Sequence, residues 1–399
     1  MTQSAKTIAQ PVHDARRAAT IRPFCGLIDP VLVEEPVLHA LPGSISRDAV
    51  TAVWTWVTRD LRPDLIPAGA MADGGFRAAA LEPSVPDILA RIKAVLDQVD
   101  HDHEAMRRLR AQTGRENARA EIAVIASALR HRALLIKAQG FGRAINTITE
   151  ESALGVALQS MPLQDPKLAA LLFQAALGQV ANPTRLITAA IRLSGNATEA
   201  AIARNGFGPL IEAFIAHAQN QIHSLELGGP FADVDLACRS LDRYHRLMRA
   251  LTGYIEFSRG SSTTQMLSTI TKAVSDRIEP RLRDMLTDLN MAMRRPRDGA
   301  DRVDNDAILA AINGMYLLSA VRDAKDSLAL NAVFDQAWNQ SAQALEIHVQ
   351  RNLDLIRQNP ADAGAGARLD AAIKMAQVRF NPEYAETLRR ARQAAERRG

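Results

Sequence analysis

A double stripe of apolar residues between Asp233 and Arg295 limits the possible folds of this chain more than any other stretch. In each half, apolar side chains recur every three or four residues, the spacing of a helix that presents one narrow face to partner helices. Between the halves, Arg259–Ser262 supplies a glycine that can end one helix and serines that can cap the next. The first stripe comprises Val234, Ala237, Leu241, Tyr244, Met248, Leu251 and Ile255, and the second comprises Leu267, Ile270, Val274, Ile278, Leu282, Met285, Leu289 and Ala292.

This pattern predicts one long α-hairpin, in which Val234–Ile255 packs antiparallel against Leu267–Ala292. A stripe on each arm closes only one seam, so further helices must cover the hairpin. The pair Glu279-Pro280 lies within the second arm. We expect it to disturb that arm, because proline has no backbone N–H to donate.

Similar but less strict seams lie at Ile88–Leu109 and Phe334–Leu355. The first of them predicts one long helix from Pro86 to about Arg110. Between residues 165 and 225 the pattern changes to shorter helices rich in Ala and Leu, with Asp165-Pro166 and Asn182-Pro183 as typical helix starts. These short helices resemble solenoids of the HEAT or armadillo kind in architecture alone, since no residue repeat accompanies the likeness.

The predicted fold is therefore all-α: an elongated array of long antiparallel helical hairpins with a middle segment of shorter solenoid-like helices. Glycines and prolines mark the expected limits of its parts. The predicted parts are an irregular, Pro-rich N-terminal segment (1–45), an N-terminal helical region (46–228), a long-hairpin helical region (229–358), and a hinge with C-terminal helices and a basic tail (359–399).

The Pro-rich N-terminal segment has too many apolar side chains in its second half for a free linker. We expect Pro23–Leu41 to lie extended along the helical body. The alternative is that this stretch is a docking peptide for another protein. Ser46 then begins the first predicted helix, which ends at about Leu61.

Composition narrows the class of protein. The chain of 399 residues carries 48 basic and 44 acidic side chains, a net charge of +4, so it is mildly basic and no polycation. Aromatic residues make up only 4%, which is typical of helices packed through small and aliphatic side chains. Residues 1–20 have no apolar signal core, and no uncharged run approaches the roughly 18 residues of a membrane span.

The two cysteines, Cys25 and Cys238, lie far apart and in dissimilar contexts. We interpret them as free thiols in a reducing compartment. The sequence thus predicts a soluble, cytoplasmic protein with no transmembrane segment.

Sequence motifs for catalysis were sought and not found. The chain has no phosphate-binding loop, dinucleotide fingerprint, nucleophile elbow or H-E-x-x-H pair, and no histidine follows a glutamate by three residues. The densest set of possible ligands is Asp100–Glu104. Its histidines, His101 and His103, point about 200° apart on an unbroken helix, so only Asp97 and His101 could share an ion there. The main interpretation is a solvated helix face, and we predict no catalytic residue, metal or cofactor.

Polar residues lie in or beside the seams at Tyr244, His245 and His348. Such groups can face one another across helices and fix their register. A catalytic base or metal ligand is the alternative interpretation for the histidines.

A cluster of arginines ends the chain. A nucleic acid or an anionic membrane surface could contact this tail, although basic residues at a helix C-terminus also compensate the helix dipole. The tail residues are Arg389, Arg390, Arg392, Arg397 and Arg398.

These observations favour a non-catalytic scaffold or adaptor that presents helical surfaces to another protein, with homo-oligomerisation as a possibility. The alternative function is regulatory binding of an anionic partner through the Arg-rich tail. An enzyme of unknown type is the third hypothesis.

Overall fold

The structure of the protein is a computed structural model that describes residues 20–66, 77–228, 232–295 and 303–397. Helices dominate these residues, as the sequence predicts. By internal packing the chain divides into two compact units. The first unit contains the described residues up to Asn220 together with Leu247–Arg259, and the second contains Gln221–Arg246 together with the described residues from Gly260 onward. In the part of the chain that is described, no helix has the length and apolar character needed to cross a membrane.

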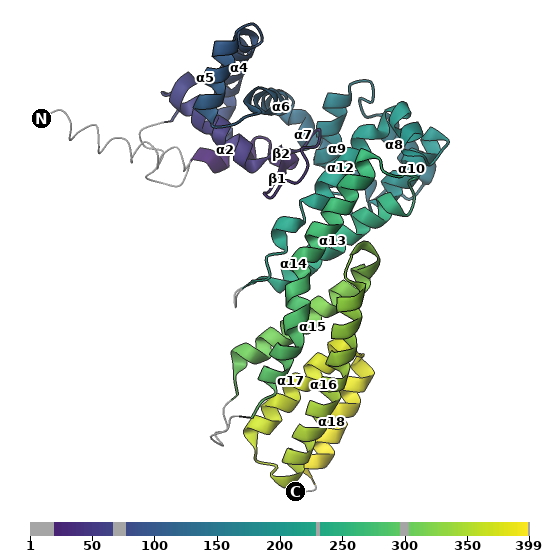
Figure 1. Cartoon of the computed structure of the whole chain (residues 1–399). Helices are drawn as coiled ribbons and strands as arrows, with labels where there is room; N and C mark the ends of the chain where they lie inside the picture. The colour runs from purple at the N-terminus through teal and green to yellow at the C-terminus, as the bar shows by residue number, and fades with distance from the viewer. Residues whose placement is uncertain (1–19, 67–76, 229–231, 296–302, 398–399) are drawn as a thin grey trace, which may run out of the picture. The chain divides into compact units, whose positions relative to one another are not determined.

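The first unit consists of many short helices and one small sheet (Figure 1). In chain order its named elements are η1 (Asp29–Val31), β1 (Leu32–Val33), β2 (Ile45–Ser46), α2 (Arg47–Trp56), η2 (Val57–Leu61), α3 (Ala78–Leu81), η3 (Glu82–Ser84), α4 (Val85–Val99), α5 (His103–Thr113), α6 (Ala118–Arg130), α7 (Arg132–Ile145), α8 (Glu151–Gln159), α9 (Pro166–Leu177), α10 (Thr184–Ser194), α11 (Glu199–Ile202), η4 (Ala203–Phe207) and α12 (Gly208–Gln219).

The core of the first unit is centred on α9. Every residue of this helix from Ala169 to Leu177 is buried, and α7 and α12 pack against it. The approach of α7 is close because Gly142 has no side chain: a Cβ there would lie only 2.1 Å from the carbonyl oxygen of Ala176. Small residues therefore let these backbones approach to a distance that larger side chains would prevent.

Residues 20–45 of the predicted N-terminal segment pack within the first unit of their own chain, and residues 1–19 lie outside the described residues. Residues 20–26 are helical, and Phe24 stacks on Trp54 with ring centroids 4.4 Å apart. Further on, β1 pairs in parallel with β2 through Leu32 opposite Ile45. The side-chain amide of Gln219 accepts a hydrogen bond from the His39 N–H (3.1 Å) and donates one to the His39 carbonyl (2.8 Å).

Part of this segment is thus helical where we predicted an irregular, extended course, because burying Phe24 against Trp54 favours a compact local turn. The start of the next helix follows the prediction. The Ser46 hydroxyl caps α2 by accepting from the Ala49 N–H (3.1 Å), and helical structure continues to Leu61.

The predicted single helix from Pro86 to Arg110 is wrong. The structure has two helices there, because α4 ends at Val99 and α5 begins at His103. The Asp102 carboxylate caps α5 by accepting from the Glu104 N–H at 2.7 Å. The apolar spacing by itself favours one continuous helix, but the side-chain cap at Asp102 starts a new helix instead.

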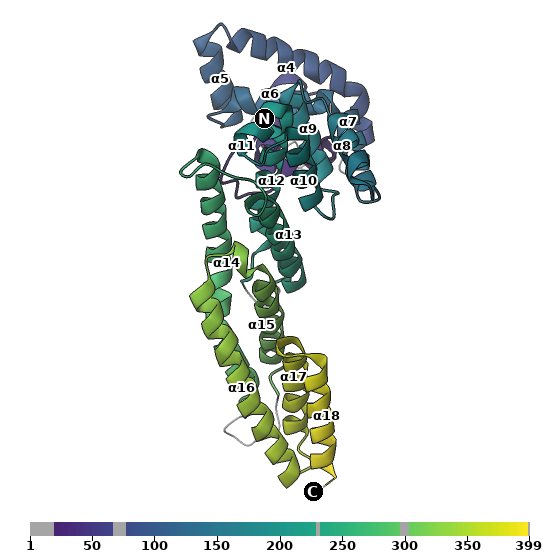
Figure 2. The same ribbon diagram turned by 90° about the vertical axis from the view of Figure 1, so that its right-hand side faces the viewer.

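The second unit consists mainly of long helices that run side by side (Figures 1 and 2). Helix α13 (Val234–Thr252) contributes its residues up to Arg246 to this unit. The other elements are η5 (Ile222–Ser224), α14 (Ser262–Ala292), α15 (Asn305–Ala324), η6 (Lys325–Ser327), α16 (Asn331–Gln358), α17 (Ala363–Arg379) and α18 (Pro382–Glu396).

Within this unit α14 packs against α15 and α16, and α17 packs against α15, α16 and α18. Every residue of the second predicted stripe is buried. Ser261 caps α14 by accepting from the Thr264 N–H at 3.2 Å, directly after Gly260 in the left-handed region with φ 72°. Helix α14 continues through Pro280, so the proline removes one backbone donor and does not end the helix.

Candidate partner-binding groove

The second unit contains a groove of about 760 Å³, which we call the acidic groove. It lies between α14, α15 and the described residues 225–228 and 232–234. Its charged lining consists of Glu226, Asp276, Asp284, Asp288, Asp306, Arg277 and Arg281, and its apolar lining includes Leu225, Leu227, Val234, Pro280, Leu309 and Ala310.

Helix periodicity explains why these side chains line one groove. Asp276, Pro280, Asp284 and Asp288 follow one another at intervals of four residues, so they form one row along α14. The buried stripe of α14 anchors the opposite side of the helix in the core. The acidic row is therefore held on the outer surface by the packing of the apolar one.

The groove carries an excess of negative charge. Asp276 pairs with Lys272 (2.7 Å) and Asp288 pairs with Arg281 (2.9 Å). Within the described residues no ion pair is formed by Glu226, Asp284 or Asp306. A cationic partner would therefore be favoured, with a contribution that added salt weakens.

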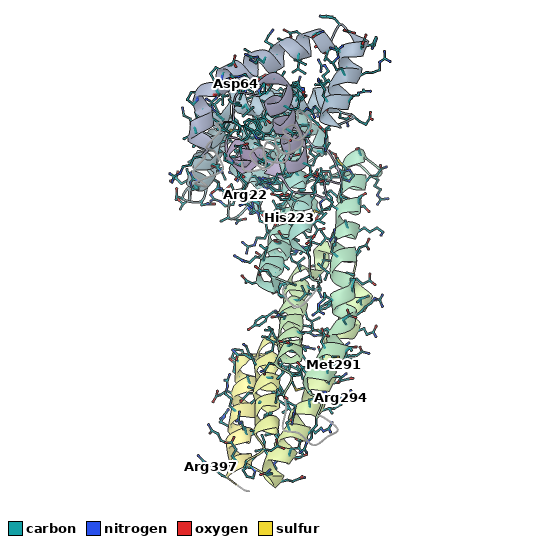
Figure 3. The ribbon with its side chains drawn as sticks, turned by 90° about the vertical axis from the view of Figure 1, so that its left-hand side faces the viewer. Arg22, Asp64, His223, Met291, Arg294 and Arg397 are labelled. Atoms are coloured by element: carbon teal, nitrogen blue, oxygen red, sulfur yellow. The ribbon has the colours of Figure 1, made fainter. Side chains whose placement is uncertain are left out.

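Apolar side chains extend along the outer face of α15. Leu309 is 52% exposed and Tyr316, seven residues later, is 46% exposed. Residues separated by seven lie on the same face of a helix. Met291, near the C-terminal end of α14 (Figure 3), is 54% exposed. Leu309 lines the groove, so this exposed apolar surface reaches the carboxylates at that residue.

The polar seam residues Tyr244 and His245 lie together, outside the acidic groove. The Tyr244 hydroxyl donates to the carbonyl oxygen of Ser327 (3.1 Å) and lies 3.1 Å from the Thr271 hydroxyl. His245 Nδ1 is 2.9 Å from the Ser327 hydroxyl. Burial raises the pKa of Tyr244 to about 12, against the opposing effect of the Thr271 hydrogen bond. These contacts join α13, α14 and η6 and account for both polar side chains structurally.

His348, the third seam residue, is separate from this pair. Its Nε2 lies 2.9 Å from the side-chain oxygen of Asn290 and so connects α16 with α14. Its Nδ1 is buried and makes no hydrogen bond in the described structure. Burial, and secondarily the charge of Arg351, lowers the pKa of His348.

The basic tail is largely engaged in contacts within the chain. Arg389 pairs with Glu386 at 3.0 Å, and Arg392 pairs with Asp370 and, at 2.8 Å, with Glu396. Arg390 donates to the Thr387 hydroxyl at 3.5 Å. Arg397 lies at the end of the last helix (Figure 3), and Arg398 lies outside the described residues.

The acidic and histidine-rich cluster at Asp100–Glu104 is used for helix capping and ion pairing. Asp100 pairs with Arg119 of α6, and Asp97 pairs with Lys93 at 2.5 Å. The described ranges contain no group of three or more histidine, cysteine or acidic side chains placed to hold a metal ion.

Sequence reasoning missed the buried arginine at the end of α17. Arg379 is 8% exposed, and its guanidinium lies 3.5 Å from the centroid of the Trp338 ring. It donates to the Trp338 carbonyl (2.7 Å) and to the Ser341 hydroxyl (3.2 Å). Burial and the nearby charge of Arg322 lower its pKa to about 10. This arginine fastens α17 to α16.

Sequence reasoning also missed the acidic groove, because its walls come from three separate segments. The available signal was the row of Asp276, Pro280, Asp284 and Asp288 opposite the apolar stripe. No family model, curated protein or solved structure matches this chain.

Proposed function

We propose that this protein is a non-catalytic helical scaffold or adaptor whose acidic groove binds a basic, amphipathic helix of another protein. The observation that carries the proposal is the row of carboxylates along α14 beside the exposed apolar face of α15. The carboxylate row can pair with lysines or arginines on one side of a partner helix, and the apolar face can contact apolar anchors on its other side.

The bound partner is a helix in this proposal because of the spacing of the apolar groups. Leu309 and Tyr316 are two helical turns apart, which matches anchors placed at i and i+7 of a docked helix. Leu225 and Leu227, which are 1% and 6% exposed, form an apolar floor that already belongs to the core. Such a floor needs little rearrangement on binding.

A binding experiment on the full-length protein tests this proposal. The probe is a fluorescent peptide of about 18 residues, built from leucine and lysine as an amphipathic helix about 27 Å long. Its binding is followed by fluorescence anisotropy. A shuffled peptide of the same composition and a peptide with glutamate in place of lysine are the controls. We expect the amphipathic basic peptide to bind and both controls to bind at least tenfold more weakly.

Variants locate the binding site. Asp284→Arg and Leu309→Glu should each weaken binding of the basic peptide by about fivefold or more, since each removes about 1 kcal/mol or more of favourable contact. Asp323→Arg makes the same charge change on α15 at a residue that does not line the groove and should alter binding less than twofold. Equal binding of the shuffled peptide, or equal effects of Asp284→Arg and Asp323→Arg, would contradict the proposal.

The finer architecture of the scaffold is also part of this proposal. We infer that α13 and α14 form the long antiparallel hairpin and that the short helices of the first unit stack like a solenoid. The contact between the Tyr244 and Thr271 hydroxyls supports the first inference, because Tyr244 lies eight residues before the end of α13 at Thr252 and Thr271 lies nine residues after the start of α14 at Ser262.

A cytoplasmic location fits the same proposal, since Cys25 and Cys238 are both free thiols. Binding of nucleic acid or an anionic membrane through the tail has less support. Arg389 and Arg392 already pair with carboxylates of their own chain.

A further inference from the structure

The first unit contains a second hollow, a cleft of about 680 Å³ between residues 33–49 and residues 115–124. Its volume lies in the range of small-molecule sites, roughly 300–1,000 Å³. Apolar side chains form much of its wall, among them Val33, Leu41, Ile45 and Val124. Leu41 and Ile45 are buried, whereas Val124 is 37% exposed. The buried side chains of Leu41 and Ile45 therefore form the apolar base of the cleft, and Val124 lies at its solvent-accessible edge.

The wall formed by residues 33–49 is fixed to the rest of the unit. Gly43 lies so close to α9 that a Cβ would be 2.3 Å from the Ala170 carbonyl oxygen, and its φ of +79° favours glycine. The β1–β2 pairing and the two hydrogen bonds between Gln219 and His39 hold the same stretch at other points. A cleft with fixed walls loses little conformational entropy when a ligand enters.

Three carboxylates and one guanidinium line this cleft. Arg115 makes a two-pronged ion pair with Glu121, with both N–O distances 2.9 Å. That hydrogen-bonded pair is the main reason that the pKa of Arg115 is raised, and the charges of Glu35 and Asp48 add to the effect. In the described part of the chain neither Glu35 nor Asp48 forms an ion pair of its own. The cleft thus has an unneutralised negative charge.

We propose that this cleft binds a small organic cation, an amine carried on an apolar body. The ammonium group faces Glu35 and Asp48, and the apolar body lies against the valine and leucine side chains. An anionic ligand is disfavoured for two reasons. The Arg115 guanidinium is already paired with Glu121, and the carboxylates of Glu35 and Asp48 repel an anion. This site is independent of the acidic groove of the second unit.

Each of the two carboxylates also has a local role that must be separated from ligand binding. Glu35 accepts a hydrogen bond from the Val37 N–H at 2.9 Å. Asp48 lies in the first turn of α2, where a negative charge favours the helix. Thermal unfolding of each variant, measured beside ligand binding, separates a loss of folding from a loss of the site.

Calorimetric titration of the full-length protein with butylamine, pentylamine and hexylamine tests the proposal. Affinity should rise about threefold to fourfold with each added methylene, as expected for burial of the chain. Hexylamine should bind at least tenfold more tightly than 1-hexanol, and hexanoate should not bind. Equal binding of hexylamine and 1-hexanol would overturn the proposal, because the carboxylates would then play no part.

Variants place the amine in the cleft. Glu35→Gln and Asp48→Asn should each weaken hexylamine binding by about threefold to fivefold, with a larger loss in the double variant. Glu116→Gln is the matched control. Glu116 follows Arg115 in the connection between α5 and α6, but its side chain is 92% exposed and does not line the cleft. Hexylamine should also shift the methyl signals of Val33 and Val124 in NMR spectra. Unchanged affinity in the folded double variant, or shifts elsewhere only, would overturn the assignment.

Discussion

The two units bury their helices in different ways. In the first unit, α9 is covered on all sides, and Gly142 lets the backbone of α7 reach the backbone of α9. In the second unit, α14 buries one stripe and leaves a row of charged residues on its outer surface. The first arrangement depends on the absence of side chains at a few positions, and the second depends on the presence of apolar side chains at regular intervals.

This difference affects where each unit tolerates change. A close contact between two backbones has no rotamer that can move aside, so an added methyl group must shift a whole helix. A seam of long side chains can repack around a small change. Binding surfaces differ in the same way, because a helix with one buried stripe leaves its other faces available for partners.

The largest expected effect is that of Gly142→Ala in the first unit. The new Cβ would lie 2.1 Å from the Ala176 carbonyl oxygen, and such overpacking lowers the free energy of unfolding by about 1–3 kcal/mol or more. Gly140 is in the same helix and has nothing within 4 Å of its would-be Cβ. Gly140→Ala should raise the free energy of unfolding by about 0.5–1 kcal/mol. Urea unfolding followed by circular dichroism compares the two, and similar midpoints would refute the contrast between the units.

The sequence was informative where burial is periodic. All of the second stripe, from Leu267 to Ala292, is buried as predicted, because one face of a long helix must repeat every three or four residues. Helix α9 has no such signal, since all of its residues from Ala169 to Leu177 are buried. A helix without a solvated face shows composition but no period.

Other features depend on contacts between segments distant in sequence. The helical course of residues 20–26 is supported by Trp54, and the acidic groove combines α14, α15 and residues 225–228 and 232–234. Spacing within one segment contains no information on which other segment it meets. The break between α4 and α5 is different, because the capping residue Asp102 is visible in the sequence, but the prediction followed the apolar spacing and did not use it.

The second prediction concerns the buried hydrogen bonds of Tyr244 in the second unit. Tyr244→Phe removes a buried hydroxyl that contacts the Ser327 carbonyl and the Thr271 hydroxyl, so the free energy of unfolding should fall by about 1–2 kcal/mol. Tyr316→Phe, at a residue 46% exposed, should change it by less than about 0.5 kcal/mol. The stability of the wild type should also fall as pH rises from 10 toward 12, because the tyrosine pKa is raised in the folded state to about 12. If Tyr244→Phe is as stable as Tyr316→Phe, these contacts do not help to hold the seam.

A milder effect is expected for Gly314→Ala, the second-unit counterpart of Gly142→Ala. Here the added Cβ would lie 3.0 Å from Cγ of Met285, a flexible side chain that can move. The packing cost and the gain in helix propensity, about 1 kcal/mol, should nearly cancel. The midpoint of urea unfolding should therefore stay close to that of the wild type. A loss as large as that of Gly142→Ala would show that α14 and α15 are as tightly constrained as α7 and α9.

The smallest expected effect is a pH dependence at His348, which tests whether a polar contact in the second unit adds to the seam. The pKa of this histidine is lowered in the folded state by burial and then by Arg351, so the unfolded chain takes up the proton first as pH falls. The contribution of His348 to stability is therefore present above pH 6.5 and declines as pH falls below it toward the lowered folded pKa. His348→Gln keeps a polar group that can meet Asn290 and should lose stability less steeply between pH 7 and pH 5, measured by thermal unfolding. His101→Gln, at an exposed position of the first unit, is the control. If His348→Gln follows the wild-type pH dependence, the contact between α16 and α14 at Asn290 tolerates the protonated ring, and the apolar stripe alone sets the stability of that seam.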